Sequence, residues 1–294
     1  MAARWLRVLA AAPLMLSALA ALPAKALVPY VAVPAEPNLE GAGLGIAQAA
    51  ARLLRIGQAE DAARLAALTV QLIPEDPRGW VLLAEAQLRS NQDKEAAVSL
   101  AKARELDPKN AGILFAQGSL ALKDSRPSEA AELIRQGLRL DGKNAGAYFD
   151  LGNAYILMGQ SGDALAAFER ASGLRSDFWE AINNQALVLY EQKKTAEAIK
   201  RWRRVLGIKP AAEPTLALAA ALNSEKPGNS ESLELAARAL AEEPNYVLDS
   251  WQKEQLWGPQ LRSDAARLLA EPALKADVER AQANAGANDD LGDE

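Results

Sequence analysis

Residues 145–178 read AGAYFDLGNAYILMGQSGDALAAFERASGLRSDF, and the spacing within this stretch decides the fold. Aromatic and small residues recur in it at these positions: Tyr148, Leu151, Gly152, Tyr155, Ala164, Phe168 and Ala171. The pattern is that of a helix–turn–helix unit of about 34 residues. Such a unit cannot bury its apolar face alone, so it must stack on copies of itself.

The same period continues on both sides of this stretch. Turn-type residues stand 34 positions apart along the chain: Pro74, Pro108, Gly142, Ser176, Pro210 and Pro244. This register predicts units that begin at Gly43, Pro77, Ala111, Ala145, Trp179 and Glu213. The sequence therefore predicts six stacked helical hairpins over residues 43–246.

Small residues keep the register in both helices of each hairpin. In the first helices they are Ala50, Ala84, Gly118, Gly152, Ala186 and Ala220. In the second helices they are Ala62, Ala96, Ala130, Ala164, Ala198 and Ser232. Because two helices approach closely only where the facing side chains are small, these residues are expected at the helix seams. Larger residues are expected to fill the gaps: Trp80, Leu100, Leu114, Ile134, Phe168, Ile182 and Trp202.

By these residues the chain resembles the tetratricopeptide repeat family over residues 43–246. The first and sixth copies match less well, as terminal repeats commonly do. The resemblance implies an all-α fold, a right-handed α-solenoid of about six repeats. The alternative is an alanine-rich helical bundle whose periodicity is accidental, and it does not account for the agreement of small and large positions across six copies.

Composition narrows the chemistry. The chain has no Cys and no His, which removes disulfides, thiol nucleophiles, imidazole bases and the usual zinc ligands. The net charge is −5 and no basic run stands out, so nucleic acid is not an expected partner. No catalytic motif is present, and the short glycine-rich stretch at residues 41–45 lacks the Lys-Ser/Thr of a phosphate loop. We expect no enzyme, no metal and no cofactor.

Residues 1–26 have the pattern of a Sec-type signal peptide. Arg4 and Arg7 precede an apolar run of residues 8–22, and Ala24-Lys25-Ala26 offers small residues before a cut. The alternative is an uncleaved anchor, which would be the chain's only link to a membrane. Residues 254–258 resemble, over a few positions, a segment of exported repeat proteins of photosynthetic bacteria. We therefore expect an exported protein of the periplasm or the thylakoid lumen.

Three further segments flank the repeats. Residues 27–42, rich in proline and valine, are expected to form an extended leader. Residues 247–283 carry an apolar helical stripe and are expected to be capping helices at the exposed end of the solenoid. Residues 284–294 form a small, acidic tail that we expect to be disordered.

The resemblance also implies a site, because tetratricopeptide arrays line a concave groove with the first helix of each repeat. Helical spacing places positions 2, 5, 9 and 12 of each repeat on that face. The candidate groove residues, from these and adjoining positions, are Phe115, Ser119, Phe149, Asn153, Ile156, Asn183, Asn184, Leu187 and Tyr190. Two alternatives stay open: the asparagines could bond between helices, and the aromatic residues could be inter-repeat core. Asp150 and Glu180 are expected on solvated helix surface.

Asn153 and Asn184 stand where family members that clamp a peptide carboxylate carry Asn. The cationic positions of such clamps hold Phe149, Pro214 and Leu218, so carboxylate capture is not expected, and recognition of the backbone of an extended or helical segment stays open. The function that we expect is a non-catalytic scaffold for a protein or peptide partner. The second hypothesis is a self-associating structural element of an envelope or thylakoid complex, in which the apolar stripe of the tryptophan-bearing C-terminal segment could meet another copy. The oligomeric state is left open.

Overall fold

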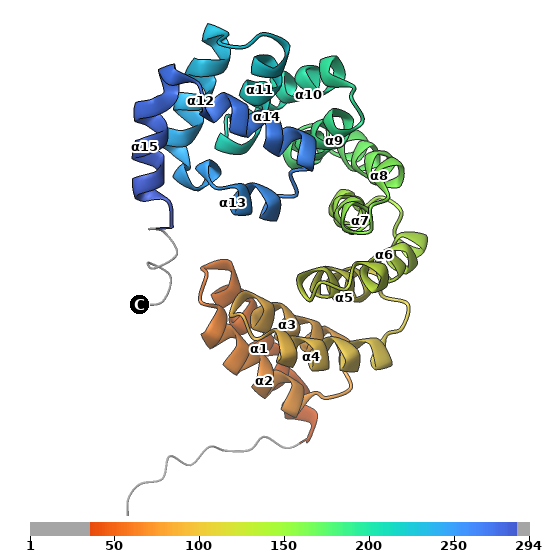
Figure 1. Ribbon diagram of the computed structural model, residues 1–294. Helices are drawn as coiled ribbons and strands as arrows, with labels where there is room; N and C mark the ends of the chain where they lie inside the picture. Colours follow the sequence, from red (N-terminus) through yellow and green to blue (C-terminus); the bar gives the residue numbers. More distant parts are fainter. Residues whose placement is uncertain (1–35, 287–294) are drawn as a thin grey trace, which may run out of the picture.

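The computed structural model describes residues 36–286, and every regular element in that range is helical (Figure 1). The first twelve helices are α1 (Glu36–Arg55), α2 (Ala59–Leu72), α3 (Pro77–Arg89), α4 (Asp93–Leu106), α5 (Ala111–Lys123), α6 (Pro127–Leu140), α7 (Ala145–Leu157), α8 (Ser161–Leu174), α9 (Trp179–Glu191), α10 (Thr195–Ile208), α11 (Ala212–Glu225) and α12 (Ser230–Glu242). The last elements are η1 (Pro244–Val247), α13 (Asp249–Glu254), α14 (Pro259–Leu269), η2 (Pro272–Leu274) and α15 (Lys275–Asn284). Consecutive helices pack in pairs, and the pairs stack into a solenoid, as the sequence predicted.

The first helices of the central pairs begin at Pro77, Ala111, Ala145 and Trp179, which are the expected repeat starts. The sixth begins one residue earlier than expected, at Ala212. The first begins at Glu36, so residues 36–42 are helical and the prediction of an extended leader is wrong there. The expected disordered tail begins at residue 284, but Asn284 is the last residue of α15, so the prediction is wrong there. The rest of the leader, the signal segment at 1–26 and the tail from residue 287 lie outside the described residues.

The recurring small residues lie at the seams. All twelve are buried, ten of them with no exposed surface at all. Gly152 shows why they must be small: a Cβ added there would lie 2.4 Å from Cε1 of Phe168. Of the large residues expected between repeats, Trp80 alone is only half-buried, and its indole nitrogen donates to the carbonyl of Pro74 at 2.7 Å.

The turn inside each hairpin has a feature that the sequence analysis missed. The backbone is left-handed at residues 34 positions apart: Gly57, Asn91, Ser125, Gly159 and Lys193. Only two of the five are glycine, so three turns hold an ordinary residue in a conformation that L-amino acids rarely adopt. In the sixth repeat the left-handed residue is Gly228, one position later, and α12 starts correspondingly late at Ser230.

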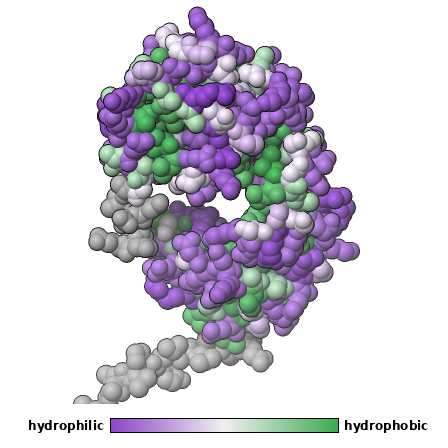
Figure 2. All heavy atoms as spheres, viewed as in Figure 1, coloured by the Kyte–Doolittle hydropathy of each residue, from purple (hydrophilic) through white to green (hydrophobic). Residues whose placement is uncertain are grey.

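The stack curves, with α5, α7 and α9 toward its inner side and α6, α8 and α10 toward its outer side (Figure 1). An open space remains between the C-terminal segment and the first repeats (Figure 2). Within residues 36–286, no helix combines the length and the apolar character needed to cross a membrane.

The C-terminal segment does more than cover the end of the stack. As predicted, it is helical, and α15 with η1 packs on α12, the last helix of the array. In contrast, α14 packs on α9 and α11, the first helices of the last two repeats. Because first helices form the inner face, α14 lies in the concavity itself, which a cap on the end would not do.

Candidate protein-binding groove

The inner face of the solenoid divides into two regions. The first helices of repeats 1–4, which are α1, α3, α5 and α7, form a region that we call the open groove. The first helices of repeats 5 and 6, which are α9 and α11, form a region that α14 covers, here called the occupied groove. The edge of α9 that faces α7, with Asn184, borders the open groove and is counted with it. The candidate residues are distributed over both.

Two polar pairs bridge neighbouring repeats across the open groove. The hydroxyl of Ser119 donates to a carboxylate oxygen of Asp150 at 2.6 Å, and the amide of Asn184 donates to the side-chain oxygen of Asn153 at 3.0 Å. Both pairs join the ninth residue of one repeat to the sixth residue of the next. The interpretation of Asn153 and Asn184 as amides that bond between helices is therefore confirmed, although both side chains remain half-exposed.

Asp150 does not lie on solvated helix surface, where it was expected. It is largely enclosed, and this desolvation raises the pKa of its carboxyl group, while the hydrogen bond from Ser119 acts in the opposite direction. The groove between α5 and α7 thus contains an acid with one hydrogen-bond donor and no cation in contact.

Hydrophobic candidates of the open groove contribute mainly to packing. Phe115 lies against Gly137 of α6, where an added Cβ would meet its ring at 2.5 Å. Phe149 packs between Phe168 and Phe178, with ring centroids 5.8 and 5.1 Å away. Ile156 is half-buried in the same cluster as Phe168. These residues shape the floor of the groove more than they offer free surface.

The remaining candidates lie under α14. Asn183, Leu187 and Tyr190 are buried, with 1 %, 5 % and 2 % of their surface exposed. The prediction that they line a groove open to a partner is wrong for this structure, because the chain itself covers them. Leu187 is the ninth residue of its repeat and Leu218 is the sixth residue of the next, so two leucines of one buried cluster stand where the open groove has polar pairs.

Asn183 belongs to a buried polar group that sequence analysis did not identify. Its amide donates to Glu213 at 2.9 Å and its oxygen accepts from the indole of Trp202 at 3.0 Å. Glu213 also accepts from the indole of Trp257, just ahead of α14, at 3.3 Å. Burial raises the pKa of Glu213 to about 7, against these two hydrogen bonds.

A second polar group fixes α14 from the other side. The hydroxyl of Tyr190 donates to Asp264 at 2.6 Å, and Asp264 is 1 % exposed. Glu191 accepts from the backbone N–H groups of Gln260 and Leu261 at 3.1 and 2.9 Å. The carboxylate thus satisfies free donors in the first turn of α14, as an N-cap residue would.

An apolar hollow of about 320 Å³ opens at the far end of the groove, between α1, α2 and α3. Leu44, Ala47 and Ala51 of α1 line it together with Ile73 and Leu82. Leu44 remains 37 % exposed, which is unusual for a leucine at a helix seam. This hollow extends the open groove to the first repeat.

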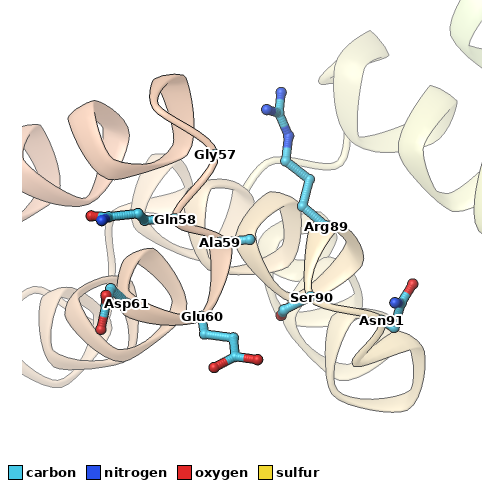
Figure 3. Close-up of a pocket in the computed structure, with 8 residues that line it drawn as sticks. All are labelled: Gly57, Gln58, Ala59, Glu60, Asp61, Arg89, Ser90 and Asn91. Atoms are coloured by element: carbon cyan, nitrogen blue, oxygen red, sulfur yellow. The ribbon is translucent and has the colours of Figure 1, made fainter. Parts of the chain in front are cut away.

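A further pocket of about 380 Å³ lies at the edge of the stack, between the turns of repeats 1 and 2. Figure 3 shows that its side chains diverge, with Arg89 and Glu60 pointing to opposite sides. Arg89 pairs with Glu85 of its own helix at 2.7 Å. Within residues 36–286, no group of three or more acidic side chains is arranged to hold a metal ion. The pocket follows from the turn geometry and brings no reactive groups together.

A curved stack of helical hairpins with a continuous inner groove defines the class of helical-repeat proteins. Residues 121–184 match the tetratricopeptide repeat family. The match covers the end of the third hairpin, the whole of the fourth, where the sequence register was strongest, and the start of the fifth, so this part of the chain carries tetratricopeptide repeats. No curated protein matches it in sequence.

Solved structures of the same fold agree with this assignment. PilW, described as a widely conserved type IV pilus biogenesis factor, is 18 % identical over 76 % of this chain and 97 % of its own, with a TM-score of 0.59. MamA of Desulfovibrio magneticus RS-1 is 20 % identical over 59 % of this chain and 97 % of its own, with a TM-score of 0.54. YrrB, described as having an unusual peptide-binding site, is 21 % identical over 65 % and 99 %, with a TM-score of 0.53. At these identities the likeness shows the fold.

Proposed function

We propose that the protein is a non-catalytic scaffold that binds a segment of a protein partner in its open groove. The observation that carries the proposal is α14, a helix seated on the inner face of two repeats by both apolar and polar contacts. The same face continues over repeats 1–4 without a helix of its own among the described residues. A surface that binds one helix in the last repeats is thus available in the others.

The side chains of the open groove suit a polypeptide. Ser119, Asp150, Asn153 and Asn184 offer hydroxyl, carboxylate and amide groups that can pair with a peptide backbone. The apolar hollow at Leu44 can take an aliphatic or aromatic side chain. The peptide-binding site described for YrrB supports the proposal by analogy of fold alone.

We also propose that the chain acts outside the cytoplasm, on the strength of the signal pattern in residues 1–26. Mass spectrometry of the protein from its native cells is the test. A mature chain that begins at Leu27 is the expected result, and a chain that retains Met1 in the soluble cytosolic fraction contradicts the proposal.

The second hypothesis, self-association through the C-terminal apolar stripe, loses its motivation. Trp257, Leu261 and Leu268 of that stripe are at most 3 % exposed, since they pack on the occupied groove of the same chain. A second copy cannot reach them in this structure.

Because the chain has no cysteine, a single introduced thiol tests the groove cleanly. Ser119→Cys carries a photoreactive maleimide on the inner face, and Ala166→Cys carries it on the exposed outer side of α8 as a matched control. After irradiation in a native extract, we expect a discrete partner on Ser119→Cys alone. Adding Asn184→Arg should remove that product. Equal capture from both faces would show that the groove is not the binding surface.

A further inference from the structure

The helix α14 is bound by the occupied groove in the way that one protein binds the helix of another. Its buried residues are Leu261, Asp264, Ala265 and Leu268, none more than 1 % exposed. They recur at i, i+3, i+4 and i+7, which is the stripe of an amphipathic helix in a groove. The other face of α14 carries Ser263, Ala266 and Arg267, which are exposed.

Polar contacts give this arrangement a direction and a register. Glu191 accepts two backbone N–H groups at the start of α14, so it recognises the beginning of a helix irrespective of side chains. Tyr190 donates to Asp264 at 2.6 Å, one turn further along. The two contacts come from adjacent residues at the end of α9 and together fix where the bound helix begins.

The segment that supplies α14 is a tether outside the repeat register. Between α13 and α14 the backbone is left-handed at Leu256, with φ of 64°. Gly258 follows, and there a Cβ would meet Glu191 at 2.2 Å. A side chain at this position would therefore displace the Glu191 carboxylate from the start of α14. A row of hydrogen bonds also links Asn153 in the open groove through Asn184 and Asn183 to Glu213 and Trp257 beside α14.

We propose that the occupied groove between α9 and α11 is a binding site for an amphipathic helix, that α14 is its occupant in cis, and that a partner helix with the same stripe exchanges with α14. The required pattern is Leu-x2-Asp-Ala-x2-Leu, preceded by a helix start that Glu191 can cap. This inference names a partner class for the scaffold proposed above, and it concerns the repeats that α14 covers.

The test uses the chain's own helix as the probe, a fluorescein-labelled peptide of residues 256–271. The receptor is the full chain carrying Leu261→Glu and Leu268→Glu, which frees the groove in cis. We expect this chain to bind the peptide at least about tenfold more tightly than the unaltered chain, whose tethered α14 competes at a millimolar effective concentration. A peptide with the same two substitutions is the matched control and should not bind.

Two further variants place the peptide on the receptor. Tyr190→Phe, added to the freed chain, should weaken binding about tenfold because it removes the donor to Asp264. Ser119→Ala in the open groove should leave binding unchanged. Equal binding of both peptides, loss of binding with Ser119→Ala, or no binding at millimolar peptide to a freed chain that keeps its helical spectrum overturns the proposal.

Amide hydrogen exchange of the unaltered chain tests, without any substitution, whether α14 leaves the occupied groove. If α14 is a releasable occupant, its amides exchange as a group before those of α9 and α11. Protection of α14 that is lost only with global unfolding refutes the proposal. This outcome is independent of the crosslinking at Ser119, which can fail while α14 is released, or succeed while it stays in place.

Discussion

From repeat 3 to repeat 6, the open and occupied grooves are built from the same repeat but differ at one pair of positions. Where the groove is open, Ser119–Asp150 and Asn153–Asn184 join the ninth residue of one repeat to the sixth of the next. Where α14 covers it, the pair is Leu187–Leu218, and both are buried with the leucines of α14. Among these repeats the character of the inner face therefore changes at these two positions, while the small residues at the seams behind them stay buried.

The largest effect is expected from removing an anchor of the occupied groove. Leu268 has no exposed surface, so Leu268→Ala should cost roughly 2–5 kcal/mol of unfolding free energy through lost burial and a cavity. Leu157→Ala, at a residue that is 50 % exposed in the open region, should cost less than about 0.5 kcal/mol. Urea unfolding of both variants makes the measurement. Similar costs would mean that α14 adds no stability to the last repeats.

The next largest effect is expected from pH, which should change the contribution of the occupied groove to stability more than that of the open groove. Burial raises the pKa of Glu213 to about 7 in the folded chain, well above the value of a solvated glutamate. An acid with a raised folded pKa stabilises the fold fully below the unfolded pKa, and this stability is lost as pH rises from the unfolded value toward 7. The loss amounts to roughly 3 kcal/mol across that window.

Glu213→Gln should therefore flatten the dependence of the melting temperature on pH between 5 and 7. The groups that face Glu213 are Asn183 of α9, Trp257 ahead of α14, and Tyr246 of η1, whose pKa is raised by burial first and by the Glu213 charge second. The pKa of Asp150 is also raised, so in Glu213→Gln the melting temperature should keep a smaller dependence on pH of the same sign. Adding Asp150→Asn should remove this remaining dependence. An unchanged slope in Glu213→Gln contradicts the assignment.

Overpacking a seam behind the open groove should have a smaller cost. At Gly152 even a Cβ would lie 2.4 Å from Phe168, so Gly152→Leu should destabilise the chain by roughly 1–3 kcal/mol. Gly173→Leu is the control, because no atom lies within 4 Å of a Cβ added there. A melting temperature that Gly152→Leu leaves unaltered would mean that the two helices of repeat four are not in contact at this point.

The smallest effects should come from the left-handed turns. Ser125 has φ of 56°, and Ser125→Gly should stabilise the fold by about 0.5–1 kcal/mol because glycine adopts that conformation without strain. Lys193→Gly, with φ of 63° at the equivalent turn, should gain less because it also loses the contact of Lys193 with Gln260 of α14. Thermal melts of the two variants give the comparison, and a larger gain at Lys193 reverses it.

The fold was predictable because a period is a property of the sequence itself. Ala84, Gly118 and Gly152 occupy equivalent positions in successive repeats. Each is small because it is buried at a seam between helices. The helical start at Glu36 was missed because proline and valine in residues 27–42 suggested an extended chain. Proline is tolerated in the first turn of a helix, where Pro37 lies.

The groove was harder to predict, since its lining depends on contacts between distant segments. Nothing local to Tyr190 shows that Asp264, 74 residues later, accepts a hydrogen bond from its hydroxyl group. One signal was present: the groove pair turns from polar to apolar at Leu187 and Leu218, and an apolar stripe follows the last repeat. Those two facts together indicate an apolar contact with the last repeats, although the pair Ala51 and Leu82 of the first repeats is also apolar and does not contact α14.

The constant distance between equivalent turns has an evolutionary consequence. Asn110 and Asn144 both cap the helix that follows them, and the backbone on either side has the same geometry. Duplicating or deleting the stretch 111–144 would therefore rejoin like with like. Recombination could therefore lengthen or shorten the groove by whole repeats and leave the C-terminal segment that carries α14 unchanged.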